Sequence, residues 1–234
     1  MAVRIEITKA AFRLDIELGQ EDPPVEKEDI TAVTNGTLSF IESKVCTDED
    51  LPDGVEIAGQ IHPTAGKDDV GWKVGKDYAK WGDELFKDPA KKQELLQILQ
   101  PLVERAFKEG GHLLKRAMKA ILCDRFGLVS EIRIERIASL FMLCWNLFKT
   151  AVIAHSVVKA FEVLGKILKH VILFLQETRF FEKLREMGGW VGLQELVRSY
   201  RPAITITSVK YLTVATTAAI AGGLAVYLYL KYKD

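Results

Sequence analysis

Hydrophobic residues recur at helical spacing over most of this chain. One such pattern predicts a helix over residues 27–45, and later stripes end near residue 122. Residues 137–148 are apolar on nearly every side, which is typical of a central helix enclosed by other helices. An amphipathic stretch follows at 152–175, with shorter helical patterns at 180–187 and 190–200. The sequence therefore predicts an all-α bundle of about eight helices around a hydrophobic central helix.

Two segments before residue 74 lack this helical spacing. Residues 3–18 alternate between apolar and polar positions, which favours a short strand or an extended arm. Residues 47–73 are rich in glycine, proline and aspartate and predict a flexible loop. We therefore divide the chain into an N-terminal arm at 1–26, a helical domain at 27–201 and a C-terminal segment at 208–231.

The C-terminal segment has the features of a membrane anchor. Twenty uncharged residues, Tyr211 to Leu230, lie between Lys210 and Lys231. A helix of that length covers roughly 30 Å, the thickness of the hydrocarbon core of a bilayer. The alternative is a buried C-terminal helix, but such helices rarely extend this far without a charge. The sequence predicts a transmembrane helix that holds the preceding domain on one side of a membrane.

Composition narrows the range of functions. The 32 basic and 32 acidic side chains balance, so nucleic acid is not an expected partner. The three cysteines, Cys46, Cys123 and Cys144, are widely spaced and predict reduced thiols of a cytosolic domain. The four histidines lack metal-ligand spacing, and no phosphate loop or nucleophile elbow is present. We expect neither an enzyme nor a bound metal or cofactor.

A four-point apolar stripe occupies one face of the helix predicted from residue 74. Its members are spaced by four, three and four residues, and they are Val74, Tyr78, Trp81 and Leu85. Within the stripe, Gly82 leaves room for the backbone of a partner, and Asp83 can reach a cation. An amphipathic core helix has the same composition, so the pattern alone leaves both interpretations open.

The order of these features resembles the Bcl-2 family of apoptosis regulators. Residues 81–85, Trp-Gly-Asp-Glu-Leu, look like its third homology region (BH3), the helix exchanged between members. Residues 187–193, with Gly188, Gly189 and Trp190, look like its second (BH2), although we expect Trp190 to be structural first. The resemblance covers residues 27–234. It implies a cytosol-facing domain at the mitochondrial outer membrane or endoplasmic reticulum, which binds BH3 helices of other family members in homo- or heterodimers.

The first homology region of the family is matched only in part. Its usual motif is Asn-Trp-Gly-Arg, whereas residues 133–136 read Arg-Ile-Glu-Arg, so only Arg136 is present. The resemblance implies that Arg136 pairs with the aspartate of an incoming helix, which Glu135 would repel. By position it also implies groove walls, each equally compatible with plain core: Leu85, Met118, Ile121, Leu122, Ser139 and Leu143.

The family includes two opposite functions. A pro-survival member holds BH3 helices in its groove, whereas a Bax- or Bak-like effector releases its own BH3 helix, oligomerises and permeabilises the membrane. Tyr78 and Trp81 are bulky for a helix that must enter another groove, which favours the pro-survival receptor. Trp81, where pro-survival members tend to carry alanine, and residues 189–193 are closer to the effectors. The sequence favours the receptor, leaves the effector open, and also allows a membrane adaptor unrelated to cell death.

Overall fold

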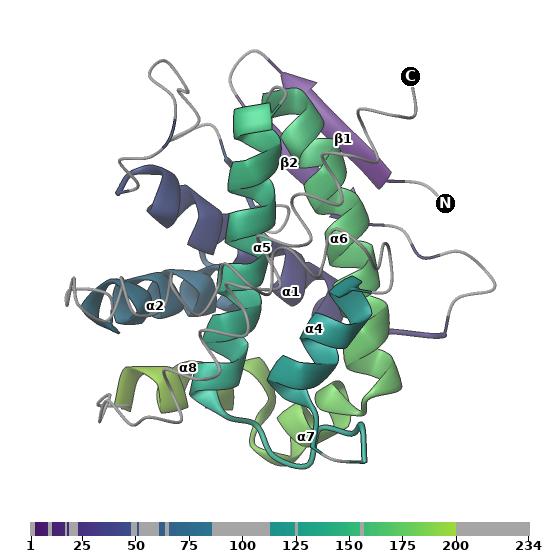
Figure 1. The fold of residues 1–234 in the computed structure, drawn as a ribbon. Coiled ribbons are helices and arrows are strands. Elements are labelled where there is room, and N and C mark those ends of the chain that lie inside the picture. The colour runs from purple at the N-terminus through teal and green to yellow at the C-terminus, as the bar shows by residue number, and fades with distance from the viewer. Residues whose placement is uncertain are drawn as a thin grey trace.

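The computed structural model describes residues 3–8, 11–16, 18, 23–47, 51, 61–63, 66–85, 113–124, 126–154 and 157–199. In these ranges two strands precede seven helices: β1 (Val3–Thr8), β2 (Ala11–Ile16), α1 (Lys27–Val45), α2 (Val70–Leu85), α4 (Leu113–Leu122), α5 (Ile134–Ala154), α6 (Val157–Glu177), α7 (Phe180–Glu186) and α8 (Gly189–Ser199). Figure 1 shows the helices arranged around α5, with the strands on the outside, near α6.

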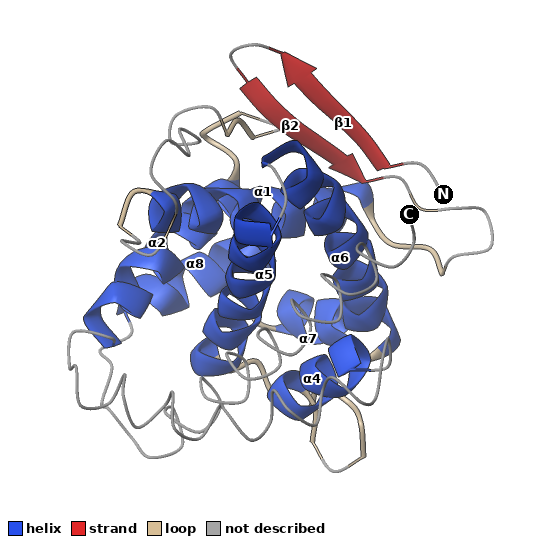
Figure 2. Cartoon of the chain, turned by 45° about the horizontal axis from the view of Figure 1, so that its top comes forward, coloured by secondary structure: helices blue, strands red, loops and turns tan. Residues whose placement is uncertain are grey.

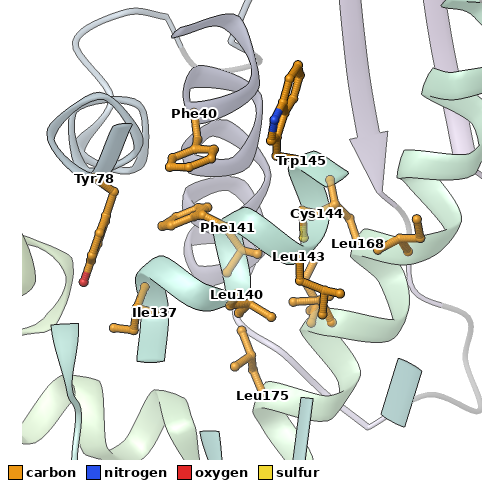
Figure 3. Close-up of a cluster of buried hydrophobic side chains, with 14 of the residues drawn as sticks. Phe40, Tyr78, Ile137, Leu140, Phe141, Leu143, Cys144, Trp145, Leu168 and Leu175 are labelled. Atoms are coloured by element: carbon orange, nitrogen blue, oxygen red, sulfur yellow. The ribbon is translucent and has the colours of Figure 1, made fainter. Parts of the chain in front are cut away.

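Helix α5 forms the centre of the bundle. Its Phe141 ring stacks on Phe40 of α1 with centroids 5.4 Å apart, and its Phe148 ring meets Phe161 of α6 edge-on at 5.0 Å. Figure 3 shows the buried side chains gathered between α1, α5 and α6. Because α5 is apolar on nearly every side, only surrounding helices can bury it. The prediction of an all-α class for the helical domain is confirmed over the described residues.

The N-terminal strands form an antiparallel hairpin. Their register pairs Val3 with Ile16 at one end and Thr8 with Ala11 at the other. Both strands pack on α6, and β2 also contacts α1. The hairpin lies outside the helices in Figure 2. The extended segment predicted from alternation is therefore present, as two strands rather than one.

Helix α2 begins earlier than the sequence pattern indicates. Asp69 precedes its first residue, and the Asp69 Oδ1 atom accepts a hydrogen bond of 3.1 Å from the backbone N–H of Trp72. This N-cap satisfies a backbone donor that the first turn leaves without a helical acceptor. The predicted loop at 47–73 is thus wrong for residues 70–73. Likewise, α6 begins at Val157 rather than at residue 152, because α5 continues to Ala154.

Several predictions fall on other parts of the chain. One of the apolar stripes that precede residue 122 covers residues 95–107, and both it and the predicted anchor at 208–231 lie outside the described residues. Among the helices that are described, none is long and apolar enough to cross a membrane. Cys123 and Cys144 are buried and Cys46 is exposed. Burial raises the pKa of Cys144 to about 12, so this thiol stays protonated at neutral pH.

Candidate functional site

The first half of the apolar stripe on α2 faces the core. Val74 and Tyr78 are fully buried, and the Tyr78 ring lies 5.3 Å from the Phe141 ring of α5. In Figure 3 Phe141 lies next to both Phe40 and Tyr78, which come from α1 and α2. The backbone of α2 continues to Leu85, whereas the side chains of Trp81, Gly82, Asp83 and Leu85 lie outside the described set. The helix that resembles BH3 is thus packed into the bundle over its first turns.

Small residues bring α1 and α2 into backbone contact. A Cβ atom on Gly71 would overlap the carbonyl oxygen of Ala32, and one on Gly75 would overlap that of Gly36. A Cβ on Gly36 would lie 3.1 Å from the Gly71 carbonyl oxygen. No side chain larger than a hydrogen fits at either α2 position without moving the helices apart.

A buried hydrogen bond adds to this contact. The hydroxyl group of Ser39 in α1 donates to the carbonyl oxygen of Trp72 in α2 at 2.6 Å. Both residues are buried, so the bond is shielded from competing water. The sequence interpretation missed this helix pair. The signal was present in the spacing of four that separates Ala32 from Gly36 and Gly71 from Gly75.

Arg136 joins the start of α5 to the end of α4. Its Nη1 atom donates a hydrogen bond of 2.9 Å to the carbonyl oxygen of Leu122, the last residue of α4. A cation at a helix C-terminus is favourable, because the last carbonyl groups carry the negative end of the helix dipole. Arg136 therefore stabilises the α4–α5 junction in this conformation, and it lies beside one of the predicted groove residues.

The predicted groove walls are part of the core in this conformation. Five of the six are at most 2% exposed, and they are Met118, Ile121, Leu122, Ser139 and Leu143. The sixth, Leu85, has a side chain outside the described set. The Ser139 hydroxyl donates to the carbonyl oxygen of Glu135, one turn earlier, at 2.7 Å. The structure brings the α4 and α5 members together, as buried side chains rather than as an open surface.

The segment that resembles BH2 turns the chain from α7 into α8. Gly188 and Gly189 have φ angles of +95° and +67°, in the left-handed region that glycine adopts without strain. A Cβ on Gly192 would overlap the Met187 carbonyl oxygen, so this turn also requires a third glycine. Trp190, at 7% exposure, is buried directly after the turn.

The indole of Trp190 is anchored to the first turn of α1. Its Nε1 atom donates to the Asp29 Oδ1 atom at 2.9 Å, and Arg185 donates to the Asp29 Oδ2 atom at 2.8 Å. Arg185 also pairs with Glu26 at 2.8 Å. The expectation that Trp190 is a structural anchor agrees with this arrangement. The sequence interpretation did not identify its partner, because the two residues are 161 positions apart.

Asp29 is a buried carboxylate with an altered acidity. Burial raises the pKa of Asp29 above its usual value of 3.8, although the Trp190 hydrogen bond and the Arg185 charge both act to lower that pKa. Its two side-chain partners satisfy the two oxygens separately. The folded protein therefore holds the Asp29 carboxylate by two specific hydrogen bonds, and its burial costs desolvation free energy.

A second carboxylate connects α2 to α8. The Asp77 Oδ2 atom accepts hydrogen bonds from Arg198 Nε at 2.9 Å and from Gln194 Nε2 at 3.4 Å. Asp77 follows the stripe residue Val74 by one turn, so this pairing holds the helix that resembles BH3 from a second side. Helix α2 is thus fixed by α1, α5 and α8 together.

Comparison of the chain with protein-family models, with curated proteins and with solved structures finds no match. A functional proposal therefore depends on the residues and on their geometry.

Proposed function

We propose that this chain is a Bcl-2-type regulator of apoptosis, and that it acts as a pro-survival receptor for BH3-type helices of pro-apoptotic partners. The observation that carries the proposal is the position of α2, the helix that resembles BH3, packed against α1 and the hydrophobic central helix α5. The order of parts supports it further, because the α4–α5 junction carries Arg136 and the α7–α8 turn carries Gly188, Gly189 and Trp190.

The contacts that hold α2 in place support the receptor role. An effector must release this helix, which here requires separation of Gly71 and Gly75 from α1 and loss of the Ser39–Trp72 hydrogen bond. Release also exposes Tyr78, which is fully buried against Phe141. Each of these changes opposes the release of α2 from the conformation described. A receptor does not incur these costs, because it keeps α2 in place as part of the scaffold.

Ligand entry requires a local opening between α4 and α5. Met118, Ile121 and Leu143 are buried, so an incoming apolar helix reaches them only if α4 moves. Such a movement separates Arg136 from the Leu122 carbonyl oxygen, and its guanidinium group can then exchange this contact for a ligand aspartate. Glu135, directly before Arg136, disfavours ligands with several acidic residues at that point.

The proposed place of action is the cytosolic face of the mitochondrial outer membrane or the endoplasmic reticulum. The uncharged segment from Tyr211 to Leu230 would hold the domain there. A second candidate function is that of a Bax- or Bak-like effector. Residues 81–85, Trp-Gly-Asp-Glu-Leu, favour it, since their sequence is closer to the effectors.

Two measurements on the full chain separate these functions. Titration calorimetry of the protein in lipid nanodiscs against a panel of synthetic BH3 helices should show saturable binding, and no binding to the whole panel would refute the receptor. Dye-loaded liposomes carrying the protein should retain their dye when a BH3 helix is added. Leakage that grows with oligomer formation would instead identify an effector.

A further inference from the structure

The proposed function does not use the outer edge of the β-hairpin. Strand β1 pairs with β2 on one side, and no other strand of the described residues pairs with it on the other. Figures 1 and 2 both show β1 as the strand farther from the helices. Every second residue of a strand directs its backbone N–H and C=O groups to the same side, so β1 has a row of such groups pointing away from β2. An edge of this kind is a template for a further strand.

Charges alternate with apolar residues along the hairpin. In the register of the hairpin Arg4 stands opposite Asp15 and Glu6 opposite Arg13, so each charged position of β1 is paired with a residue of opposite charge on β2. Opposite charges at facing positions stabilise a strand pair. The positions between them are Val3, Ile5 and Ile7, which share a face with Ile16, a buried residue.

The sequence of β1 is complementary to itself. When a second copy of Val3–Thr8 is placed antiparallel with Ile5 opposite Ile5, Arg4 of each copy faces Glu6 of the other. Val3 then faces Ile7, so apolar positions also meet apolar positions. The charges at these facing positions therefore alternate in sign across the four strands. Asp15 and Arg4 belong to the first copy, and Glu6 and Arg13 belong to the second. A shift of this register by one residue would place Ile5 opposite a charged residue, so the charge pairs and the apolar pairs would both be lost.

The packing of the hairpin is compatible with this arrangement. Helix α6 contacts both strands, and in Figures 1 and 2 the other helices lie on the β2 side of the hairpin. A two-fold axis perpendicular to the sheet puts both helical domains on the same sheet face. Each α6 helix then lies against its own hairpin on that face.

We propose that two copies of this chain dimerise through antiparallel pairing of their β1 strands, centred on Ile5, to form a four-stranded sheet. The symmetric contact uses the same edge of each copy and leaves no β1 edge open for further growth. It also extends a two-stranded hairpin, which packs on α6, into a four-stranded sheet. The dimer does not involve the α4–α5 junction and is independent of BH3 binding.

The test uses the full chain in detergent micelles, with sedimentation velocity as the measure of mass. The wild-type protein should be a dimer. The double variant Arg4→Glu/Asp15→Arg keeps opposite charges within the hairpin and places two carboxylates opposite each other between copies. The double variant Glu6→Arg/Arg13→Asp also keeps opposite charges within the hairpin, but it places two cations opposite each other between copies. Each alone should dimerise at least about tenfold more weakly than wild type.

Mixing the two double variants supplies the decisive comparison. In the mixed dimer, opposite charges again face each other at every position, so the mixture should regain the wild-type dimer mass. If the hairpin of a double variant does not form, the fourfold variant that combines both sets of changes, and so keeps every pairing, must dimerise as wild type does. A wild-type monomer, a double variant that dimerises normally, or a mixture that stays monomeric would each overturn the proposal.

Discussion

Gly75 of α2 lies against the backbone of Gly36 of α1, so closely that a Cβ atom at position 75 would overlap the Gly36 carbonyl oxygen. One turn earlier, Gly71 has the same relation to Ala32. Two stripes of small residues, each with a spacing of four, therefore face each other where the helices cross. The contact fixes the helix that resembles BH3 to the domain at the point where an effector would have to release it.

Substitution of Gly75 should reverse the usual effect of a glycine replacement. In an exposed helix Gly→Ala stabilises by about 1 kcal/mol, because glycine has a low helix propensity. At position 75 the added methyl group must separate two backbones, and we expect Gly75→Ala to lower the free energy of unfolding by about 2 kcal/mol. Urea denaturation measures the change. Lys76→Ala, exposed on the same helix, should stay within about 0.5 kcal/mol of wild type. A stabilised Gly75→Ala protein would contradict the close contact.

The Asp29 carboxyl should make stability depend on pH. Its pKa is raised in the folded protein, mainly by burial, so the folded state binds a proton more tightly than the unfolded state does. The stability that this group contributes is present below pH 3.8 and is lost as pH rises through its folded pKa. The free energy of unfolding of wild type minus that of Asp29→Asn should therefore decrease with rising pH over that interval, then level off.

Denaturation curves at a series of pH values check the sign. A difference that increases with pH would mean that the Arg185 charge and the Trp190 hydrogen bond outweigh burial. Trp190→Phe serves as a companion variant, because it keeps an aromatic ring and removes only the indole donor. Its pH dependence should be steeper than that of wild type, since the bond that lowers the Asp29 pKa is lost.

Local patterns along the chain predicted the helices well. The helix at 27–45 agrees with α1 at both ends, and the stripe before residue 123 agrees with the end of α4. These segments combine a clear apolar period with glycine or charged residues at their limits, so the local signal agrees with the tertiary environment. Helix α2 is different, because Asp69 caps its start and lies outside the apolar period. The period alone therefore placed the start of this helix too late.

The candidate site could be predicted only in part, because its defining relations are between distant segments. Asp29 and Trp190 are bonded although most of the chain separates them, and a single sequence carries no record of such a pair. The sequence also could not show that Met118 and Leu143 are covered, since core and groove residues have the same composition. Arg136 was identified by motif, while its bond to Leu122 follows from the turn between α4 and α5.

Arg136 should matter for ligand binding more than its neighbour Arg133 does. If Arg136 pairs with a ligand aspartate, Arg136→Ala should cost about 2–5 kcal/mol of binding free energy for a BH3 helix, the range for a buried interfacial ion pair. Arg133 is exposed and pairs with Glu131, so Arg133→Ala should leave affinity nearly unchanged. Calorimetry with one BH3 peptide compares both variants. Equal affinities for Arg136→Ala and wild type would limit Arg136 to its role at the end of α4.

The C-terminal segment can be tested separately from the domain. A lysine in place of Leu224, near the middle of the uncharged stretch, should cost roughly 2.5–3.5 kcal/mol of membrane insertion. The Leu224→Lys protein should shift from the membrane to the soluble fraction when cells are fractionated, whereas Leu224→Ile should stay with the membrane. Equal membrane association of the two variants would argue against a spanning helix in this segment.

Tyr78 offers a test of how the core treats a polar group. Its side chain is fully buried, and its hydroxyl group has no hydrogen-bond partner among the described residues. Burial, with a smaller effect from the Glu135 carboxylate, raises the pKa of Tyr78 well above its usual value, so the phenol stays protonated. A buried hydroxyl without a partner destabilises the folded state.

Tyr78→Phe removes this hydroxyl and keeps the ring that lies against Phe141. We expect the free energy of unfolding to rise by about 1 kcal/mol, since the desolvation cost disappears and the aromatic contact stays. Tyr78→Leu is the matched control, because it also removes the hydroxyl but loses the ring contact, and it should be less stable than Tyr78→Phe by about 1 kcal/mol. Both are measured by urea denaturation at pH 7. If Tyr78→Phe instead loses stability, the hydroxyl has a partner outside the described residues, and α2 is held by one more bond than those identified above.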